Sequence, residues 1–383
     1  MARTVVFTVC AVNYLPRAIL LLESLARHEP GMQRRIVLSD RRMALPEVPA
    51  DVVWADQLDL PNLPAMAFRY QLIELATAVK GFAAARFLAE PDVDRVIFLD
   101  PDTRLYAPLS PLTTALDHGA EIALTPHVTE PPERAAFPTH RDLLQVGTYN
   151  LGVLGLADRR PVHRFLRWLC RRLEHECVDA RAEGVYVDQR FFDLAPSLVD
   201  RVAVVRDTGV NVAYWNLDHR RLTLVGQDWM VDGKLLRLFH FSGLDPERPA
   251  ALAGRVARNP GPALTALAGQ YAADLAASPA AGLAGARYGF GRFADGRAVP
   301  DPLRYIFRRA CEPFAGDPFV DLPGWLEAPA DDRPGLTRLM DLVWKHSAEV
   351  RRHFPLSDEA DLHKYRHAFP EVARRLGVGL QNA

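Results

Sequence analysis

The sequence predicts an α/β layered fold followed by a helical region. The chain has 383 residues, enough for one large domain and a smaller one. Short apolar runs alternate with amphipathic helical patterns, as in a sheet flanked by helices. The composition then shifts between residues 243 and 249, and the strand signals fade. We therefore expect an α/β domain at residues 1–248 and a mainly helical C-terminal module at residues 249–383.

Apolar runs rich in Val, Ile, Phe and Leu predict the strands. Runs of this kind are typical of strands buried on both faces of a sheet. In chain order we expect strands at residues 4–11, 35–38, 52–54, in the run that ends at Asp100, and at residues 121–124, 149–156, 202–205 and 235–241.

Helical periodicity accounts for most of the remaining segments. Pro16 suits the first position of a helix, where its missing N–H is not needed. We expect helices at residues 16–27, 69–88, 161–176, 261–277, 302–311, 333–352 and 358–376. A stretch rich in proline and charge at residues 126–141 predicts a loop.

Composition excludes several classes of protein. The chain is 49% hydrophobic and 24% charged, which is ordinary for a soluble globular protein. Its net charge of −1 provides no basic field to attract nucleic acid, so we expect no nucleic-acid partner. The four cysteines are scattered without a Cys-x-x-Cys pair, which argues against a zinc site or disulfide framework and fits a reducing cytoplasm.

The relation to membranes follows from two further patterns. No apolar run approaches the ~18 residues that a membrane-spanning helix needs. The predicted helix at residues 161–176 carries several arginines among apolar residues. Such a face is usually the solvated side of a docked helix, and peripheral contact with the inner face of a membrane is the alternative. We therefore expect a cytoplasmic protein, with peripheral attachment as the second interpretation.

Two aspartates follow the strand that ends near Leu99. Asp100 and Asp102 flank Pro101, which stiffens the turn and removes one backbone donor. In an open α/β sheet, ligands bind beyond the carboxyl ends of the strands, so both carboxylates lie where a ligand is expected. Hard oxygen ligands in this place suit Mg²⁺ or Mn²⁺, with the ion bridging to phosphate.

The same pair has other interpretations when taken alone. An Asp-x-Asp after an apolar run also occurs as a simple turn or as a solvated strand end. Asp100 to Thr103 partly resembles the nucleophile loop of haloacid-dehalogenase-type phosphatases, although the threonine comes one residue early. That loop normally lies near the N-terminus, whereas roughly a hundred residues of α/β sequence precede it here. The phosphatase interpretation is therefore disfavoured.

Further polar residues and two glycines follow in a fixed order around the Asp-x-Asp. They lie after the first strand, on the helix before the aspartates, and on or after later strands. They are Asn13 and Tyr14, Lys80, Asn150 and Gly152, Asp188 and Gln189, and His240 and Gly243.

This order resembles the GT-A-fold glycosyltransferases, in particular the retaining family 8 type that includes glycogenin and bacterial lipopolysaccharide galactosyl- and glucosyltransferases. The resemblance covers roughly residues 4–245. The family's Asn-Ala-Gly has Leu151 in the middle here, and Leu244-Asp245-Pro246 replaces the Lys-Pro-Trp that follows its late His-x-x-Gly. Residues 211–217 and the C-terminal helices look like those of bacterial surface-polysaccharide glycosyltransferases.

The resemblance implies a role for each matching position. Asp100, Asp102 and His240 would bind Mn²⁺ or Mg²⁺, and the imidazole favours Mn²⁺. The implied donor-binding residues are Asn13, Tyr14, Asp100, Asn150, Gly152 and Gly243. The implied catalytic residues are Lys80, Asp188 and Gln189. Three of them also have a structural interpretation: a core histidine for His240, a solvated lysine for Lys80 and a helix N-cap for Asp188.

The function implied is transfer of a sugar from a nucleotide sugar, with a UDP-sugar favoured, to a glycan or lipid-linked acceptor in bacterial surface polysaccharide assembly. Retention of configuration is expected. An inverting enzyme would need a carboxylate base, for which Asp188, Asp193 and Asp218 are candidates. The alternatives are a non-catalytic sugar-nucleotide or partner-binding module on the same fold, and a nucleotidyltransferase.

Overall fold

The computed structural model describes residues 2–131, 138–256, 261–311 and 314–378. Residues 132–137 of the predicted loop therefore lie outside the described residues. The chain forms two compact units, Met1–Leu60 with Ala76–Ala286, and Pro61–Leu75 with Arg287–Ala383. These units do not test whether a boundary between two separately folding domains lies near residue 248, so that boundary stays a prediction.

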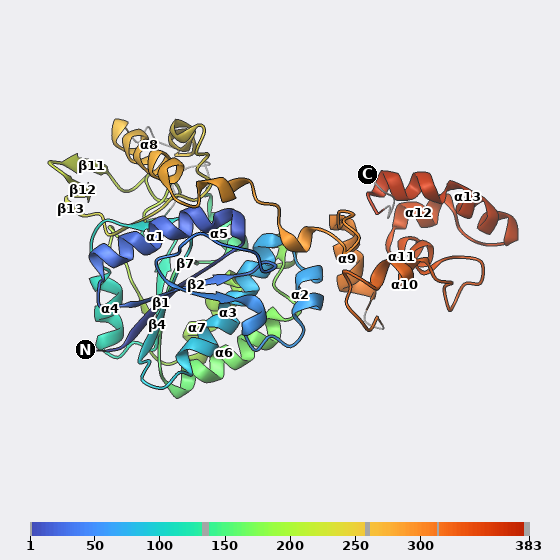
Figure 1. Ribbon diagram of the computed structural model, residues 1–383, viewed down its shortest axis with the longest axis horizontal. Coiled ribbons are helices and arrows are strands. Elements are labelled where there is room, and N and C mark those ends of the chain that lie inside the picture. Colours follow the sequence, from blue (N-terminus) through green and yellow to red (C-terminus); the bar gives the residue numbers. More distant parts are fainter. Residues whose placement is uncertain (1, 132–137, 257–260, 312–313, 379–383) are drawn as a thin grey trace. The chain divides into compact units, whose positions relative to one another are not determined.

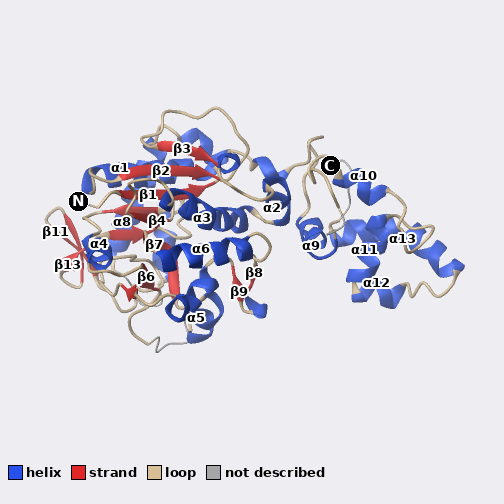
Figure 2. Ribbon diagram, turned by 90° about the horizontal axis from the view of Figure 1, so that it is seen from below, coloured by secondary structure: helices blue, strands red, loops and turns tan. Residues whose placement is uncertain are grey.

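A seven-stranded sheet forms the centre of the first unit (Figure 2). Its order is β10-β6-β7-β4-β1-β2-β3, and every pair is parallel except those made by β7. The strands are β1 (Thr4–Cys10), β2 (Gln33–Leu38), β3 (Asp51–Trp54), β4 (Arg95–Leu99), β6 (Ile122–Pro126), β7 (Tyr149–Ala157) and β10 (Val202–Val204). The predicted α/β class is confirmed.

Helices cover both faces of this sheet, which explains why β1 and β4 are buried along their whole length. Val6 and Ile97 pack in one core with α1 (Leu15–His28) and α4 (Ser110–Asp117). On the other face, Phe7 makes an edge-to-face contact with Phe87 of α3 (Leu72–Leu88). The remaining helices of this unit are α5 (His140–Val146), α6 (Arg160–Leu173), α7 (Ala195–Leu198) and α8 (Pro262–Ala277).

Short strands at the carboxyl edge of the sheet were only partly expected. β5 (Thr103–Leu105) pairs antiparallel with β14 (Leu238–His240), which places His240 opposite Thr103. The predicted strand at residues 235–241 is divided between β14 and a separate meander of three strands. The meander consists of β11 (Leu222–Val225), β12 (Asp228–Val231) and β13 (Lys234–Leu235), and a further pair joins β8 (Asp179–Ala180) to β9 (Val185–Tyr186).

The predicted helix at residues 69–88 was wrong in its first turn. α2 (Leu63–Arg69) ends before Tyr70, whose backbone is extended, and α3 begins at Leu72. Glu74 stabilises this break because its Oε2 accepts a hydrogen bond of 2.8 Å from the backbone N–H of Gln71.

The second unit contains α2 and the helices at the orange and red end of the chain (Figure 1). These are α9 (Asp301–Ala310), α10 (Leu322–Glu327), α11 (Arg338–His346), α12 (Ala348–His353) and α13 (Glu359–Leu376). The helix expected at residues 333–352 is two helices, because the extended Ser347 ends α11 and caps α12 by accepting from the N–H of Val350. Among the described helices, none has the length and apolar character needed to span a bilayer.

One buried arginine connects several segments of the second unit. Nη1 of Arg304 donates to the carbonyl oxygens of Ala67, Phe68 and Tyr70 at 2.7, 2.9 and 2.9 Å. Nη2 donates to the carbonyl of Phe290 at 2.5 Å. These four carbonyls have their donors in one side chain, so α2 and α9 depend on it.

We expect Arg304→Met to lower the free energy of unfolding by about 2–5 kcal/mol, because it removes the side chain that donates to four buried backbone carbonyls. Urea denaturation measures this loss. Arg352→Met, at an exposed position, is the matched control and should change stability by less than about 0.5 kcal/mol. Equal effects of the two substitutions would contradict the assigned role.

Candidate metal centre and its surroundings

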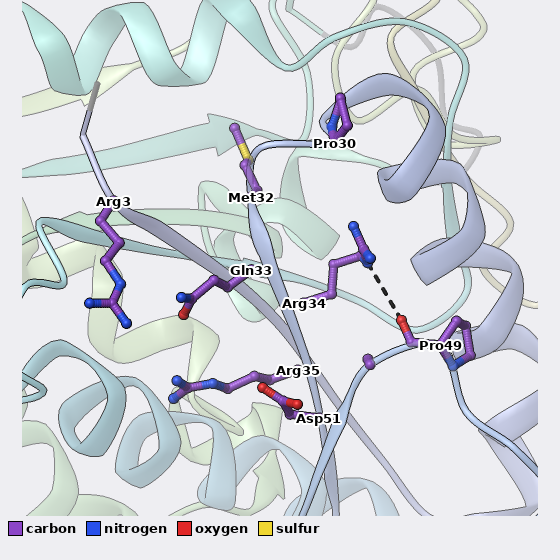
Figure 3. A pocket seen from close by; sticks show the side chains of 9 residues that line it. Arg3, Pro30, Met32, Gln33, Arg34, Arg35, Pro49 and Asp51 are labelled. Atoms are coloured by element: carbon purple, nitrogen blue, oxygen red, sulfur yellow. Dashed lines mark hydrogen bonds between the residues drawn. The ribbon is translucent and has the colours of Figure 1, made fainter.

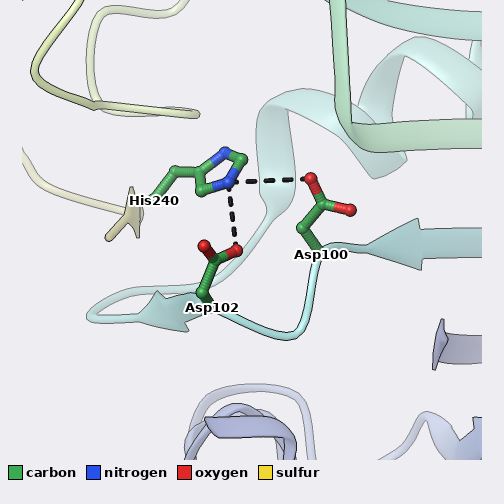
Figure 4. A group of neighbouring side chains, drawn as sticks. All are labelled: Asp100, Asp102 and His240. Atoms are coloured by element: carbon green, nitrogen blue, oxygen red, sulfur yellow. Dashed lines mark ion pairs between the residues drawn. The ribbon is translucent and has the colours of Figure 1, made fainter. Parts of the chain in front are cut away.

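Three side chains meet at the carboxyl edge of the sheet. Asp100 follows β4, Asp102 leads into β5, and His240 ends β14. Nε2 of His240 lies 3.1 Å from Oδ1 of Asp102 and 3.6 Å from Oδ2 of Asp100 (Figure 4). The backbone N–H of Phe241 donates to the carbonyl of Asp102 at 2.8 Å, so the strand pairing itself positions the histidine.

The three residues fit a divalent cation. One ligand atom from each lies within 4.8 Å of the others. Adjacent ligands of an octahedral ion at about 2.1 Å lie about 3 Å apart, close to the separations observed here. Two carboxylates and one imidazole suit Mn²⁺, and the limited number of protein ligands leaves positions for phosphate oxygens or water.

The turn between the aspartates is held by its own backbone. The N–H of Asp100 donates to the carbonyl of Gly152 on β7 at 2.9 Å. The N–H and Oγ1 of Thr103 both donate to the carbonyl of Asp100, at 3.0 and 2.7 Å. Pro101 lies within this turn and has no backbone N–H that would need an acceptor. Both carboxylates are therefore oriented by a rigid loop.

Burial and mutual charge shift the pKa values of all three groups. Burial raises the pKa of Asp100 to about 6, against the opposing effect of Lys80 and His240. Burial alone would raise the pKa of Asp102, but the charge and hydrogen bond of His240 outweigh it and lower that pKa. Burial would lower the pKa of His240, yet Asp102 and Asp100 raise it above the ordinary value. A proton on His240 therefore competes with a cation for the place between the two aspartates.

Lys80 and Asp188 form a buried ion pair beside this centre. Nζ of Lys80 lies 2.7 Å from Oδ2 of Asp188 and donates to the carbonyl of Leu151 at 3.2 Å. Both side chains are at most 4% exposed. Burial raises the pKa of Asp188, and the neighbouring ammonium opposes that rise. Lys80 is thus buried, and its interpretation as a solvated residue is wrong. Asp188 stands at the N-cap position of a 3₁₀ helix, but its side chain makes no capping hydrogen bond.

The side-chain amides of two predicted site residues form hydrogen bonds to other groups of the protein. Gln189 accepts from the N–H of Leu151 at 3.1 Å and donates to the carbonyl of Val146 at 2.7 Å. Oδ1 of Asn150 accepts from the N–H of Gly152 at 3.0 Å, and its Nδ2 lies 3.4 Å from Nε2 of His127. Direct contacts of Asn150 or Gln189 with a sugar stay predictions.

The predicted glycines make close approaches. A Cβ at Gly152 would lie 2.6 Å from Cε1 of His240, so only glycine leaves room for the imidazole. Gly243 has φ of 68°, which favours glycine, and a Cβ there would collide with the guanidinium of Arg255. These observations give both glycines a packing reason, and their contact with a donor stays a prediction.

Asn13 and Tyr14 follow β1 in a short 3₁₀ turn at the same edge of the sheet. Tyr14 is 36% exposed, and burial together with the charge of Asp102 raises its pKa. Arg17, one turn further along, stacks on the Tyr14 ring at 4.8 Å and donates to the carbonyl of Leu244 at 3.3 Å. It also helps to lower the pKa of Asp102.

Sequence reasoning missed three residues of the site. They are Arg17, His127 and Asn211. Arg17 lies three positions after Tyr14 on a helix, so helical spacing could have indicated it. His127 and Asn211 lie in irregular segments whose neighbours in space depend on the folded chain. The resemblance of residues 211–217 pointed to the segment of Asn211, but no spacing signal indicated a role for either residue.

A polar pocket of about 620 Å³ lies at the other edge of the sheet, where β1, β2 and β3 begin (Figure 3). Three arginines line it: Arg3, Arg34 and Arg35. Arg35 is engaged by Glu90 through two hydrogen bonds of 2.6 and 2.7 Å. Ligands of α/β sheets bind at the carboxyl edge, so the metal centre is the stronger candidate.

Comparisons with known proteins give relatives without an assigned role. No protein-family profile matches the chain. The uncharacterized proteins YfnF and YfnD of Bacillus subtilis (strain 168) are 28% and 27% identical to it over 166 and 161 residues. These segments cover 42% of the chain and 54% and 47% of the relatives. The chain thus spans about half the length of the curated relatives it matches.

Several solved structures are similar to the chain. The galactosyltransferase LgtC, in complex with donor and acceptor sugar analogues, is 14% identical with a TM-score of 0.47, over 72% of this chain and 96% of that one. The glycosyltransferase GlyE of Streptococcus pneumoniae TIGR4 is 17% identical, with a TM-score of 0.42 over 74% and 64%. Mouse xyloside xylosyltransferase 1 is 17% identical, with a TM-score of 0.37 over 63% and 97%. Identities this low limit the similarity to the fold.

Metal affinity should fall as the pH is lowered. Asp100 and His240 both have raised pKa values, so in acid each carries a proton that a bound cation must displace. Between about pH 8 and about pH 5.5 we expect the Kd for Mn²⁺ to rise, by up to about tenfold per pH unit for each proton. Titration calorimetry in buffers of different ionisation enthalpy measures both the affinity and the protons released. A Kd that is constant over this range would contradict the assignment.

Gly152→Ala should weaken Mn²⁺ binding at least about tenfold and destabilise the fold by about 1–3 kcal/mol, because the added methyl displaces His240. Gly31→Ala is the control, since no atom lies within 4 Å of its added Cβ. Unchanged Mn²⁺ affinity in the Gly152 variant would show that the imidazole does not ligate the ion.

Proposed function

We propose that the chain is a metal-dependent glycosyltransferase of the GT-A fold, resembling the retaining family 8 type. The observation that carries this proposal is the meeting of Asp100, Asp102 and His240 at the carboxyl edge of the sheet. Their order along the chain, with the flanking Asn-Tyr, Lys, Asn-x-Gly and Asp-Gln positions, supports it.

Different residues of the site would bind different parts of a nucleotide sugar. A divalent ion held by the two aspartates and the histidine would stabilise the negative charge that develops on the departing nucleoside diphosphate. Arg17 supplies a further positive charge next to Asp102, suited to the phosphates. Asn13 and Tyr14 would hold the base and ribose, with the half-exposed Tyr14 ring as the stacking surface.

The burial and pairing of the nearby carboxylates favour retention of the sugar's configuration. An inverting enzyme needs a carboxylate that reaches the acceptor hydroxyl. The side chain of Asp188 is 3% exposed and paired with Lys80. Asp193 is engaged by Arg190 and accepts from the N–H of Thr148 at 3.0 Å. We infer that Asp188 is no free base and that the buried Lys80–Asp188 pair contributes through its charges beside the reacting centre.

The proposed acceptor is a glycan or lipid-linked glycan, in bacterial surface polysaccharide assembly. This part rests on the resemblance of residues 211–217 and of the C-terminal helices to surface-polysaccharide glycosyltransferases. Tyr214 and Trp215 pack edge to face with ring centroids 5.2 Å apart, and Trp215 packs on His240 at 5.1 Å. Trp215 is buried, whereas the partly exposed Tyr214 ring suits the apolar face of a sugar.

A thermal-shift panel with UDP, GDP, CMP and dTDP, each with and without Mn²⁺, tests the proposal. A ligand that binds only the folded state stabilises it by about 2.7 kcal/mol at a hundredfold excess over Kd. We expect a shift for one nucleotide, with UDP favoured, that requires Mn²⁺. Asp102→Ala should abolish both that shift and sugar transfer, whereas Asp59→Ala, at an exposed position, should preserve them. No shift with any nucleotide, or normal turnover by folded Asp102→Ala, would contradict the proposal.

A further inference from the structure

The face of His240 that points away from the aspartates contacts a buried asparagine. Nδ1 of His240 lies 3.2 Å from Oδ1 of Asn211. Asn211 is 1% exposed and His240 is 4% exposed, so no water competes for this contact. The imidazole therefore has one nitrogen toward the metal centre and the other toward an amide oxygen.

The orientation of the Asn211 amide is determined by its other partners. Its Nδ2 donates to Oγ1 of Thr125 at 2.9 Å and to Oδ1 of Asn150 at 3.0 Å. Oδ1 of Asn150 also accepts from the backbone N–H of Gly152, which can only donate. The atom of Asn150 that faces Asn211 is thus an oxygen. The atom of Asn211 that faces it must be the nitrogen, and the oxygen of Asn211 is left for His240.

The far end of this chain of hydrogen bonds is equally directional. Nδ2 of Asn150 faces Nε2 of His127 at 3.4 Å, and Nδ1 of His127 lies 3.3 Å from the carbonyl of Thr148. A carbonyl only accepts, so Nδ1 of His127 carries the proton and Nε2 accepts. Burial also lowers the pKa of His127 to about 4, which keeps that ring neutral. Every link therefore has one allowed direction.

The backbone at Asn211 suits an asparagine. Its φ is 53°, in the left-handed region that asparagine tolerates better than most residues. Asn216 secures the segment by donating to the carbonyl of Asn211 at 3.0 Å and accepting from the N–H of Ala213 at 3.0 Å. Asn211 is thus held in place by contacts that do not involve the imidazole of His240.

We propose that Asn211 is a positioning residue, which keeps the proton of His240 on Nδ1 and so reserves Nε2 for the divalent cation. An unprotonated Nδ1 would bring two acceptors together at 3.2 Å, which is unfavourable. This inference rests on the proposed metal site. Partners that orient a ligating histidine in this way are worth about 10–100-fold in metal affinity.

The test compares Asn211→Gly, which removes the amide and accepts the positive φ, with Asn211→Asp, which keeps an acceptor for Nδ1. Thr125→Val is the matched control, because it removes a partner of Asn211 that does not touch His240. Titration with Mn²⁺ alone, without nucleotide, should show a Kd raised about 10–100-fold by Asn211→Gly. We expect less than about tenfold from Asn211→Asp, and about twofold at most from Thr125→Val. Unchanged affinity in folded Asn211→Gly, or equal losses in all three variants, would overturn the positioning role.

A second measurement separates this inference from the metal proposal. Histidine-selective ¹⁵N NMR of the metal-free protein reports whether Nδ1 of His240 carries a proton and how slowly that proton exchanges with water. We expect a slowly exchanging Nδ1 proton in the unmodified protein and in Thr125→Val, and faster exchange in Asn211→Gly. An unprotonated Nδ1 in the unmodified protein would overturn the inference. Absence of Mn²⁺ binding with a slowly exchanging Nδ1 proton would refute the metal site alone.

Discussion

The candidate site depends on the pairing of β5 with β14. Those two strands have three residues each, yet they bring His240 to the Asp-x-Asp turn from a position far along the chain. The N–H of Phe241 bonds to the carbonyl of Asp102 and the N–H of Asp100 to the carbonyl of Gly152, so the ligands are fixed by backbone hydrogen bonds. A metal site built on strand ends is more rigid than one on a free loop.

Charge in the site is arranged in two linked groups. Lys80 neutralises Asp188 at 2.7 Å, while His240 and Arg17 offset part of the charge of Asp100 and Asp102. The remaining negative charge is concentrated where a divalent ion fits. Paired burial of this kind is costly unless every group has a partner, and the carbonyl of Leu151 provides one for Lys80.

Much of this arrangement follows from patterns that a sequence displays directly. The apolar runs predicted the strands of the central sheet, and the position of Asp100 after such a run placed it at the carboxyl edge. Helix breaks at Tyr70 and Ser347 were not predictable, because they depend on single side-chain caps at Glu74 and Ser347 within periodic segments. The amide chain through Asn211 depends on contacts between distant segments, and hydrophobic periodicity carries no information about those.

Two departures from the pattern of the family that the chain resembles, at Leu151 and after Gly243, can be described by backbone hydrogen bonds and by charge. Leu151 stands where the pattern has alanine, but it contributes through its backbone: its N–H donates to Gln189 and its carbonyl accepts from Lys80. Its side chain, 2% exposed, affects packing alone. The residues directly after Gly243 include no lysine, yet guanidinium groups of Arg17 and Arg255 bond to the carbonyls of Leu244 and Ser242, at 3.3 Å each. Positive charge therefore reaches this loop from two other segments of the chain.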